Sequence, residues 1–137
     1  MGGYWEREAS RWLGDAEEDL RVAEALLKLG HYAAFCFHSQ QAAEKAVKAA
    51  LLAHQVEARG RSVLVLLRLL SREAGVDIEG LEEDARLLDR HYAPPRYPNL
   101  HPGVSLPAHK LYGRGDAESC LRAARSVLGF VRRLLER

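Results

Sequence analysis

Two side chains in the second half of the chain have the types and spacing that suit phosphate chemistry. Arg96 and His101 stand in the segment Arg-Tyr-Pro-Asn-Leu-His, with four residues between them. Histidine can accept and donate a proton near neutral pH, and arginine presents a fixed fork of donors that matches phosphate oxygens. Such a pair suffices to cleave RNA without a metal: His101 would take the proton of a ribose 2′-hydroxyl while Arg96 holds the charge growing on the phosphate.

The pair lies in a connection that cannot be helical. All five prolines of the chain fall between Tyr92 and Tyr112. Each proline removes a backbone donor and clashes with the preceding turn, so the sequence predicts an irregular loop over residues 93–113. Long irregular connections in compact domains are often functional. The alternative interpretation is a stiff, packed loop whose tyrosines close one end of the protein.

The elements that must position this loop are helices. Apolar residues repeat with a helical period almost throughout, and no segment alternates as a strand would. The expected helices run from about Trp5 to Leu27, His31 to Gln55, Ser62 to Ala74, Ile78 to Tyr92 and Asp116 to Leu135. Ser62 and Asp116 are the expected N-caps of their helices. We therefore expect a single all-α domain over residues 1–137, an up-and-down bundle of about five helices with the alanine-rich second helix at its centre.

Composition limits the classes of function. The chain has 137 residues, of which 47% are apolar and 28% charged, and its net charge is +1. A charge this small argues against a non-specific, high-affinity nucleic-acid binder. No segment is apolar and long enough to span a bilayer, and the N-terminus does not resemble a signal peptide. These features favour a cytoplasmic protein that does not enter a membrane.

The cysteines and histidines do not predict a metal site. Cys36 and Cys120 fall on the apolar sides of expected helices, which favours two buried thiols over a redox pair. His91, His101 and His109 lack the i,i+3 or i,i+4 spacing of a helical metal site. We expect neither a metal nor a cofactor.

Two longer motifs resemble a known family. The second expected helix contains Phe-His-Ser-Gln-Gln-Ala-Ala-Glu-Lys-Ala-Val-Lys-Ala from Phe37 to Ala49, and the later motif is Arg-His-Tyr-Ala-Pro-Pro-Arg-Tyr-Pro-Asn from Arg90 to Asn99. In this order they resemble the HEPN family, specifically its small prokaryotic branch, over about residues 12–135. The resemblance implies a four- or five-helix bundle, commonly a homodimer, often encoded beside a minimal nucleotidyltransferase as a toxin–antitoxin pair.

The same resemblance implies roles for individual residues. Active HEPN members are metal-independent ribonucleases with an Arg-x(4–6)-His motif, and the two motifs of a dimer line one cleft. Arg96 and His101 match these motif positions, which implies that they are the catalytic residues. Tyr97, Arg90 and Asn99 are the implied substrate contacts.

A polar strip within the second expected helix has two interpretations. It consists of Gln40, Gln41, Glu44, Lys45 and Lys48. The spacings Gln41–Lys45 and Glu44–Lys48 favour i,i+4 pairs on a solvated helix face. Because members of the resembled family share the strip, it can instead line a groove or a dimer contact.

The sequence thus leaves competing functional hypotheses. The first is a HEPN-type toxin or RNA-processing protein, a metal-independent ribonuclease that acts with a partner nucleotidyltransferase. The second is a non-catalytic module that binds a nucleotide or a partner protein, and a purely structural dimer scaffold is a third. Catalysis predicts that Arg96 and His101 of two subunits converge in one exposed cleft. A buried salt bridge at Arg96, with His101 pointing away, would favour the binding module.

Overall fold

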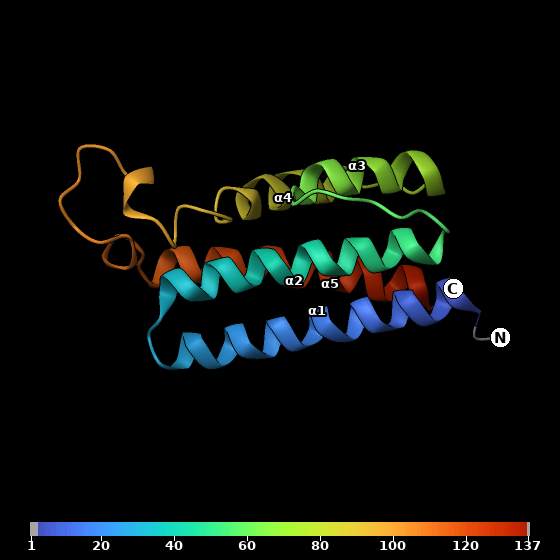
Figure 1. Ribbon diagram of the computed structural model, residues 1–137, viewed down its shortest axis with the longest axis horizontal. Helices are drawn as coiled ribbons and strands as arrows, with labels where there is room; N and C mark the ends of the chain where they lie inside the picture. The colour runs from blue at the N-terminus through green and yellow to red at the C-terminus, as the bar shows by residue number, and fades with distance from the viewer. Residues whose placement is uncertain (1–2, 137) are drawn as a thin grey trace.

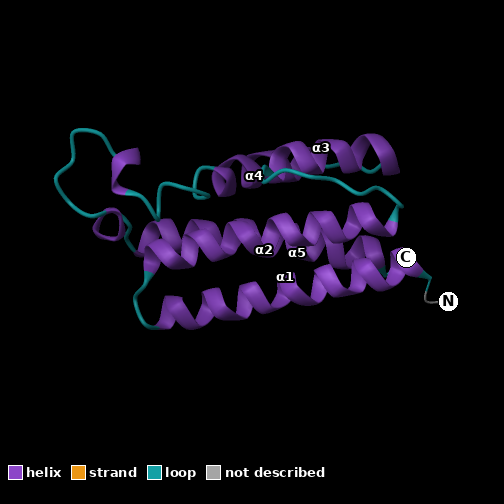
Figure 2. Ribbon diagram, in the orientation of Figure 1, coloured by secondary structure: helices purple, strands orange, loops and turns teal. Residues whose placement is uncertain are grey.

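Five α-helices make up most of the computed structural model, which describes residues 3–136, and these residues include no strand (Figure 2). The α-helices are α1 (Tyr4–Lys28), α2 (Tyr32–Ala53), α3 (Val63–Ala74), α4 (Glu82–Asp89) and α5 (Arg114–Leu135). Three short 3₁₀ turns lie between them: η1 (Glu79–Leu81), η2 (Pro98–Leu100) and η3 (Ala108–Leu111). The predicted all-α bundle of about five helices is confirmed.

Helix α2 is the centre of the bundle. It packs against α1, α3 and α5, while α4 packs against α3 and α5 (Figure 1). Small side chains on α2, such as Ala42, Ala43 and Ala46, are fully buried and let the neighbouring helices approach closely. The sequence prediction of a central, alanine-rich helix is confirmed.

The first three helices begin and end close to the predicted residues. Gly30 follows α1 with φ of +80°, a left-handed conformation that glycine adopts without a steric cost. Ser62 is the N-cap of α3, where its hydroxyl oxygen accepts a hydrogen bond from the Val65 N–H at 3.1 Å.

The other two helices differ from the prediction. A continuous helix from Ile78 to Tyr92 is wrong, because α4 begins only after η1 and ends at Asp89. If the helix continued, the rings of Pro94 and Pro95 would clash with the carbonyl groups of Arg90 and His91. Asp116 is not an N-cap either: α5 begins at Arg114, and the Asp116 carboxylate in its first turn accepts a hydrogen bond from the Gly113 N–H at 2.8 Å.

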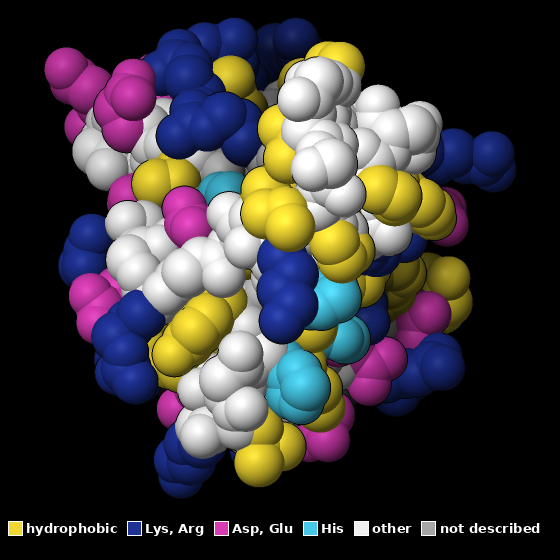
Figure 3. Space-filling model, turned by 90° about the vertical axis from the view of Figure 1, so that its left-hand side faces the viewer, with side chains coloured by type: hydrophobic (Ala, Val, Ile, Leu, Met, Phe, Trp, Pro, Cys, Tyr) yellow, Lys and Arg dark blue, Asp and Glu magenta, His cyan; other side chains and the backbone are white. Residues whose placement is uncertain are grey.

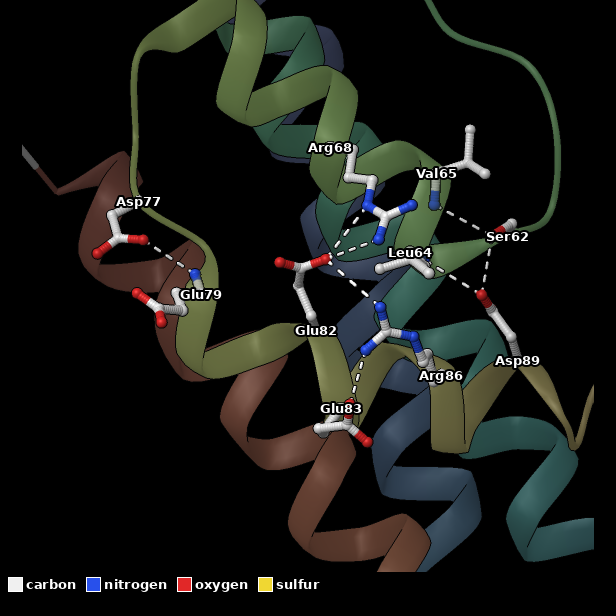
Figure 4. Close-up of polar contacts among 10 residues, drawn as sticks. All are labelled: Ser62, Leu64, Val65, Arg68, Asp77, Glu79, Glu82, Glu83, Arg86 and Asp89. Atoms are coloured by element: carbon white, nitrogen blue, oxygen red, sulfur yellow. Dashed lines mark hydrogen bonds and ion pairs between the residues drawn. The ribbon is translucent and has the colours of Figure 1, made fainter.

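One carboxylate joins the end of α4 to the beginning of α3. Asp89 accepts hydrogen bonds from the Ser62 hydroxyl at 2.8 Å and from the backbone N–H groups of Val63 and Leu64 at 2.7 and 3.2 Å. The side chain of Asp89 points at the first turn of α3 (Figure 4). A carboxylate there satisfies N–H groups that have no partner within the helix and interacts favourably with the helix dipole.

The proline-rich connection, residues 93–113, projects from one end of the bundle. It leaves α4 and returns to α5 at the end where α1 turns into α2, while both chain termini lie at the opposite end (Figure 1). Within residues 3–136, no helix is sufficiently long and apolar to cross a membrane.

Replacing Asp89 by alanine tests this helix junction. Loss of three hydrogen bonds to one charged group should lower the free energy of unfolding by about 2–3 kcal/mol, measured by urea denaturation. Asp77→Ala is the matched control, because exposed Asp77 accepts only one hydrogen bond, from the Glu79 N–H at 2.9 Å. Equal losses in the two variants would contradict the assigned role of Asp89.

Candidate functional site

The guanidinium of Arg96 is stacked among three aromatic rings. Its carbon Cζ lies 4.2 Å from the ring centroid of Phe37, 4.9 Å from that of Tyr92 and 5.0 Å from that of Tyr97. Its Nε–H donates to the Tyr92 carbonyl oxygen at 3.1 Å. Arg96 is exposed and forms no ion pair with a carboxylate of residues 3–136. The rings therefore orient the guanidinium, and the N–H groups on its two terminal nitrogens are available to an anion.

His101 is held by the backbone of the same connection. Its Nε2 lies 2.7 Å from the Pro94 carbonyl oxygen, and its ring packs edge-on against Tyr112, with the centroids 6.3 Å apart. A carbonyl oxygen only accepts hydrogen bonds, so Nε2 must carry the hydrogen. In the neutral ring, Nδ1 then has the free lone pair. His101 is half-buried, and its ring is fixed in orientation.

The structure brings Arg96 and His101 to one short segment. The carbonyl oxygens that accept from them belong to Tyr92 and Pro94, which are separated by one residue. A tight turn, in which the Arg96 N–H donates to the Ala93 carbonyl at 2.9 Å, shapes this segment. The two predicted catalytic side chains therefore share a support, although they lie in an irregular loop and not on a helix.

A second arginine contacts the same aromatic ring. Cζ of Arg61 lies 5.6 Å from the Tyr92 centroid, and Gln40 holds the Arg61 carbonyl through a 2.7 Å hydrogen bond from its Nε2. Asp89, the nearby carboxylate, is already committed to the first turn of α3. Neither Arg61 nor Arg96 therefore forms an ion pair with a carboxylate in the described part of the chain. The sequence analysis did not identify Arg61 as a site residue. Its position directly before the expected N-cap Ser62 could have indicated that it lies near the first turn of that helix.

The three predicted substrate contacts differ in their placement. Tyr97 belongs to the cluster, since its exposed ring lies against Arg96. Arg90 and Asn99 are exposed and form no side-chain hydrogen bond or ion pair with residues 3–136, so no contact draws them into the cluster. The end of the molecule that presents the proline-rich connection shows histidine, basic and hydrophobic side chains side by side (Figure 3).

Large hydrophobic side chains are exposed along the same connection. Tyr97, Leu100, Val104 and Leu106 keep 45–51% of their surface accessible. The proline-rich connection is therefore not a loop packed onto the bundle along its whole length. Exposed apolar groups beside charged ones are typical of surfaces that contact another molecule.

The residue pattern favoured a solvated face for the polar strip of α2, but the strip is largely buried. Gln40 and Glu44 are buried, at 0% and 3% exposure. Gln41 Nε2 donates to the Gln40 Oε1 at 2.7 Å, and Lys48 pairs with Glu44 at 3.0 Å, as its spacing predicted. The predicted Gln41–Lys45 pair does not form, because Lys45 Nζ lies 2.7 Å from the Asp19 carboxylate on α1. Helical spacing could not reveal how many neighbours surround α2.

Two cysteines and a histidine meet beneath the proline-rich connection. Cys36 on α2, Cys120 on α5 and His91 after α4 place their sulfur and nitrogen atoms within 4.8 Å of one another. Both cysteines are completely buried, which confirms the predicted buried thiols, but the sequence did not indicate that they meet. Nδ1 of His91 lies 3.4 Å from the Tyr112 hydroxyl. Tyr112 thus contacts both His91 and His101.

Because the two thiols lie close together, their pKa values shift in opposite directions. The hydrogen bond between the sulfurs lowers the pKa of Cys120, with help from His91, and raises the pKa of Cys36, with help from burial. Burial, together with negative charge on the neighbouring sulfurs, raises the pKa of Tyr112 to about 12. The arrangement therefore favours one thiolate at Cys120, stabilised by the S–H of Cys36.

An open groove between α5 and the segment from Asp77 to Asp84 lies apart from these residues. Asp84, Arg125, Ser126, Phe130 and Arg133 are among the residues that line it. Burial raises the pKa of the Asp84 carboxyl. None of the predicted catalytic or substrate-binding residues lines this groove, and it offers neither a histidine nor a thiol.

Comparison with known proteins places this architecture in a family. The model of the HEPN domain matches residues 9–134 of the chain. The chain belongs to the HEPN domain family. A Methanocaldococcus jannaschii protein named "Putative toxin MJ1304" is 34% identical over 98% of this chain and 92% of its own length.

Solved HEPN-fold structures are similar over nearly their whole length. TT1696 from Thermus thermophilus is 43% identical, with a TM-score of 0.86, over 93% of this HEPN chain and 98% of its own. The archaeal HEPN homologue ST0689 is 33% identical, with a TM-score of 0.75, over 91% and 95%. A HEPN domain protein from Thermotoga maritima is 34% identical, with a TM-score of 0.73, over 93% and 98%.

The buried thiols of this HEPN protein predict a pH dependence of stability. Between the lowered pKa of Cys120, about 6, and the ordinary thiol pKa of about 8.5, the folded pair has lost a proton that the unfolded chain retains, so stability should rise with pH. Above that value, Cys36 retains a proton that the unfolded chain has lost, so stability should fall. Urea denaturation against pH should show this maximum relative to the Cys36→Ala/Cys120→Ala variant. Parallel pH profiles for the two proteins would contradict it.

Proposed function

We propose that this HEPN protein is a toxin that cleaves RNA without a metal ion at the reacting phosphate, and that Arg96 and His101 are its catalytic residues. The observation that supports this most is the exposed guanidinium of Arg96, which has no carboxylate partner within residues 3–136 and is fixed on the same short segment as His101. The similarity to a protein named as a toxin supports the biological role.

In the proposed reaction, the ribose 2′-oxygen attacks the adjacent phosphorus. His101 accepts the 2′-hydroxyl proton on Nδ1, because its Nε2 hydrogen is engaged by the Pro94 carbonyl. A bond forms between the 2′-oxygen and phosphorus, the bond from phosphorus to the 5′-oxygen breaks, and the 5′-oxygen takes a proton. Arg96 holds the non-bridging oxygens through its free terminal N–H groups as their negative charge grows.

Neighbouring groups fit the binding of an RNA strand. Arg61 adds a second cation beside Tyr92, and the exposed ring of Tyr97 offers a face on which a base can stack. Arg90 and Asn99 are exposed at the two sides of the turn, and we propose that they contact the strand farther from the reacting phosphate.

The exposed hydrophobic side chains of the connection support a protein contact at this surface. We propose that a second copy of the chain contacts Leu100, Val104 and Leu106, which brings the two Arg96–His101 pairs to one cleft. The second histidine can then supply the proton to the leaving 5′-oxygen. A minimal nucleotidyltransferase encoded nearby is the proposed antitoxin partner.

The same exposed side chains favour one alternative function. Their apolar character suits a binding module that recognises the partner protein without cleaving RNA. In that case Arg96 and Tyr97 would be recognition residues, and removal of His101 would leave partner binding unchanged.

Cleavage of single-stranded RNA in the presence of a chelator tests the proposal. His101→Ala should slow cleavage by about 100- to 10,000-fold, the usual contribution of general acid–base catalysis. Arg96→Ala should slow it by about 100- to 1,000-fold, since it removes donors to the developing charge. The products should end in a 2′,3′-cyclic phosphate.

His109→Ala is the matched control, because His109 is an exposed histidine of the same connection. It should cleave at the rate of the parent protein. A parent protein that cleaves no RNA, or a His101→Ala variant as fast as the parent, would overturn the ribonuclease proposal.

Leu106→Asp tests the proposed dimer. A charge in the contact should shift the protein from dimer to monomer in sedimentation velocity and reduce cleavage. The control is Val65→Asp, because Val65 is exposed to 62% on α3, away from the connection. An unchanged dimer in Leu106→Asp would exclude this surface as the contact between copies.

A further inference from the structure

The site formed by Cys36, His91 and Cys120 is separate from the proposed reaction, which uses none of these side chains. Their ligand atoms all lie within 4.8 Å of one another. Tetrahedral zinc coordination requires about 3.5–3.8 Å between such atoms, so side-chain shifts of about 1 Å would suffice. Their segments, α2, the turn after α4 and α5, meet only in the folded chain.

We propose that Cys36, His91 and Cys120 bind a thiophilic divalent metal ion of the zinc class, as a structural site that holds the two ends of the proline-rich connection. Sulfur and imidazole ligands select zinc over magnesium and calcium, which prefer oxygen. Both cysteines are fully buried, and two thiolates neutralise a divalent cation there. Three protein ligands leave the fourth position to water.

The surroundings of the cluster favour the bound form. His91 is half-buried, so one of the three proposed ligands is partly accessible to solvent. Its Nδ1 lies 3.4 Å from the Tyr112 hydroxyl, so a donated Nδ1 hydrogen leaves the lone pair on Nε2 for a metal. Thiols bind a metal as thiolates, so binding displaces the protons of Cys36 and Cys120.

A bound metal ion would restrict the movement of the two ends of the proline-rich connection. His91 lies just before the connection, and Tyr112 lies at its end, where its ring also packs against His101. A metal on His91 would therefore fix the neighbours of His101 without approaching the substrate phosphate. This role differs from that of the catalytic pair, so the site and the ribonuclease activity can fail independently.

Titration of the reduced, metal-free protein with Co²⁺ tests the site directly. We expect one Co²⁺ per chain, an absorption band from sulfur-to-cobalt charge transfer, and displacement of Co²⁺ by Zn²⁺ but not by Mg²⁺. Zn²⁺ should also raise the temperature of unfolding, because the folded chain alone assembles the ligands.

Variants assign the ligands. His91→Ala and Cys120→Ala should each weaken binding by more than the roughly 100-fold that loss of an outer-shell partner can cost. His109→Ala should bind as the parent does. Circular dichroism verifies the fold, and His91→Ala remains informative if a cysteine variant fails to fold because His91 is only half-buried.

Three results would overturn the proposal. The first is a reduced, folded parent that gives no sulfur–cobalt band with millimolar Co²⁺. The second is equal binding by the parent and the folded His91→Ala variant. The third is a protein whose only cysteine chemistry is a Cys36–Cys120 disulfide under air, detected by mass, while the reduced form binds no metal.

Discussion

The burial of α2 among its neighbours is the constraint on which the rest of the structure depends. A helix surrounded by α1, α3 and α5 must have small side chains at its contacts, and its long buried polar side chains must find partners within the protein. Gln40 does so by binding the Arg61 carbonyl, and Glu44 by pairing with Lys48. Farther toward its N-terminus, α2 presents Phe37 to Arg96 and Cys36 to the second thiol, so one helix supports both sites.

The proline-rich connection depends on how the bundle fixes its two ends. Asp89 ties the end of α4 to α3, and Asp116 closes the first turn of α5 on Gly113. Between these points, the prolines exclude helix and the side chains fold back onto backbone carbonyls, as Arg96 and His101 do. These contacts restrict the conformations of the loop before a substrate binds. Binding therefore costs less conformational entropy than it would in a flexible loop.

The helices were predictable because their information is local. The apolar period and the helix-capping residues predicted the bounds of α1, α2 and α3 to within about two residues. The prolines indicated that the candidate site lies in the connection. Local pattern could not reveal contacts between distant segments. The approach of Cys36 to Cys120, the burial of Gln40 and the stacking of Arg61 on Tyr92 all depend on how helices pack. The predicted continuation of α4 to Tyr92 failed because the rings of Pro94 and Pro95 would clash with the preceding helical turn, which the apolar spacing does not reflect.

The central claim is that Arg96 and His101 act together on one phosphate. A double-mutant cycle on single-turnover RNA cleavage measures this directly, with Arg96→Ala, His101→Ala and the combined variant compared with the parent. Groups that act as a unit are strongly non-additive, so the combined variant should be scarcely slower than His101→Ala alone. Losses that simply multiply, or a parent protein that leaves RNA intact, would contradict the account.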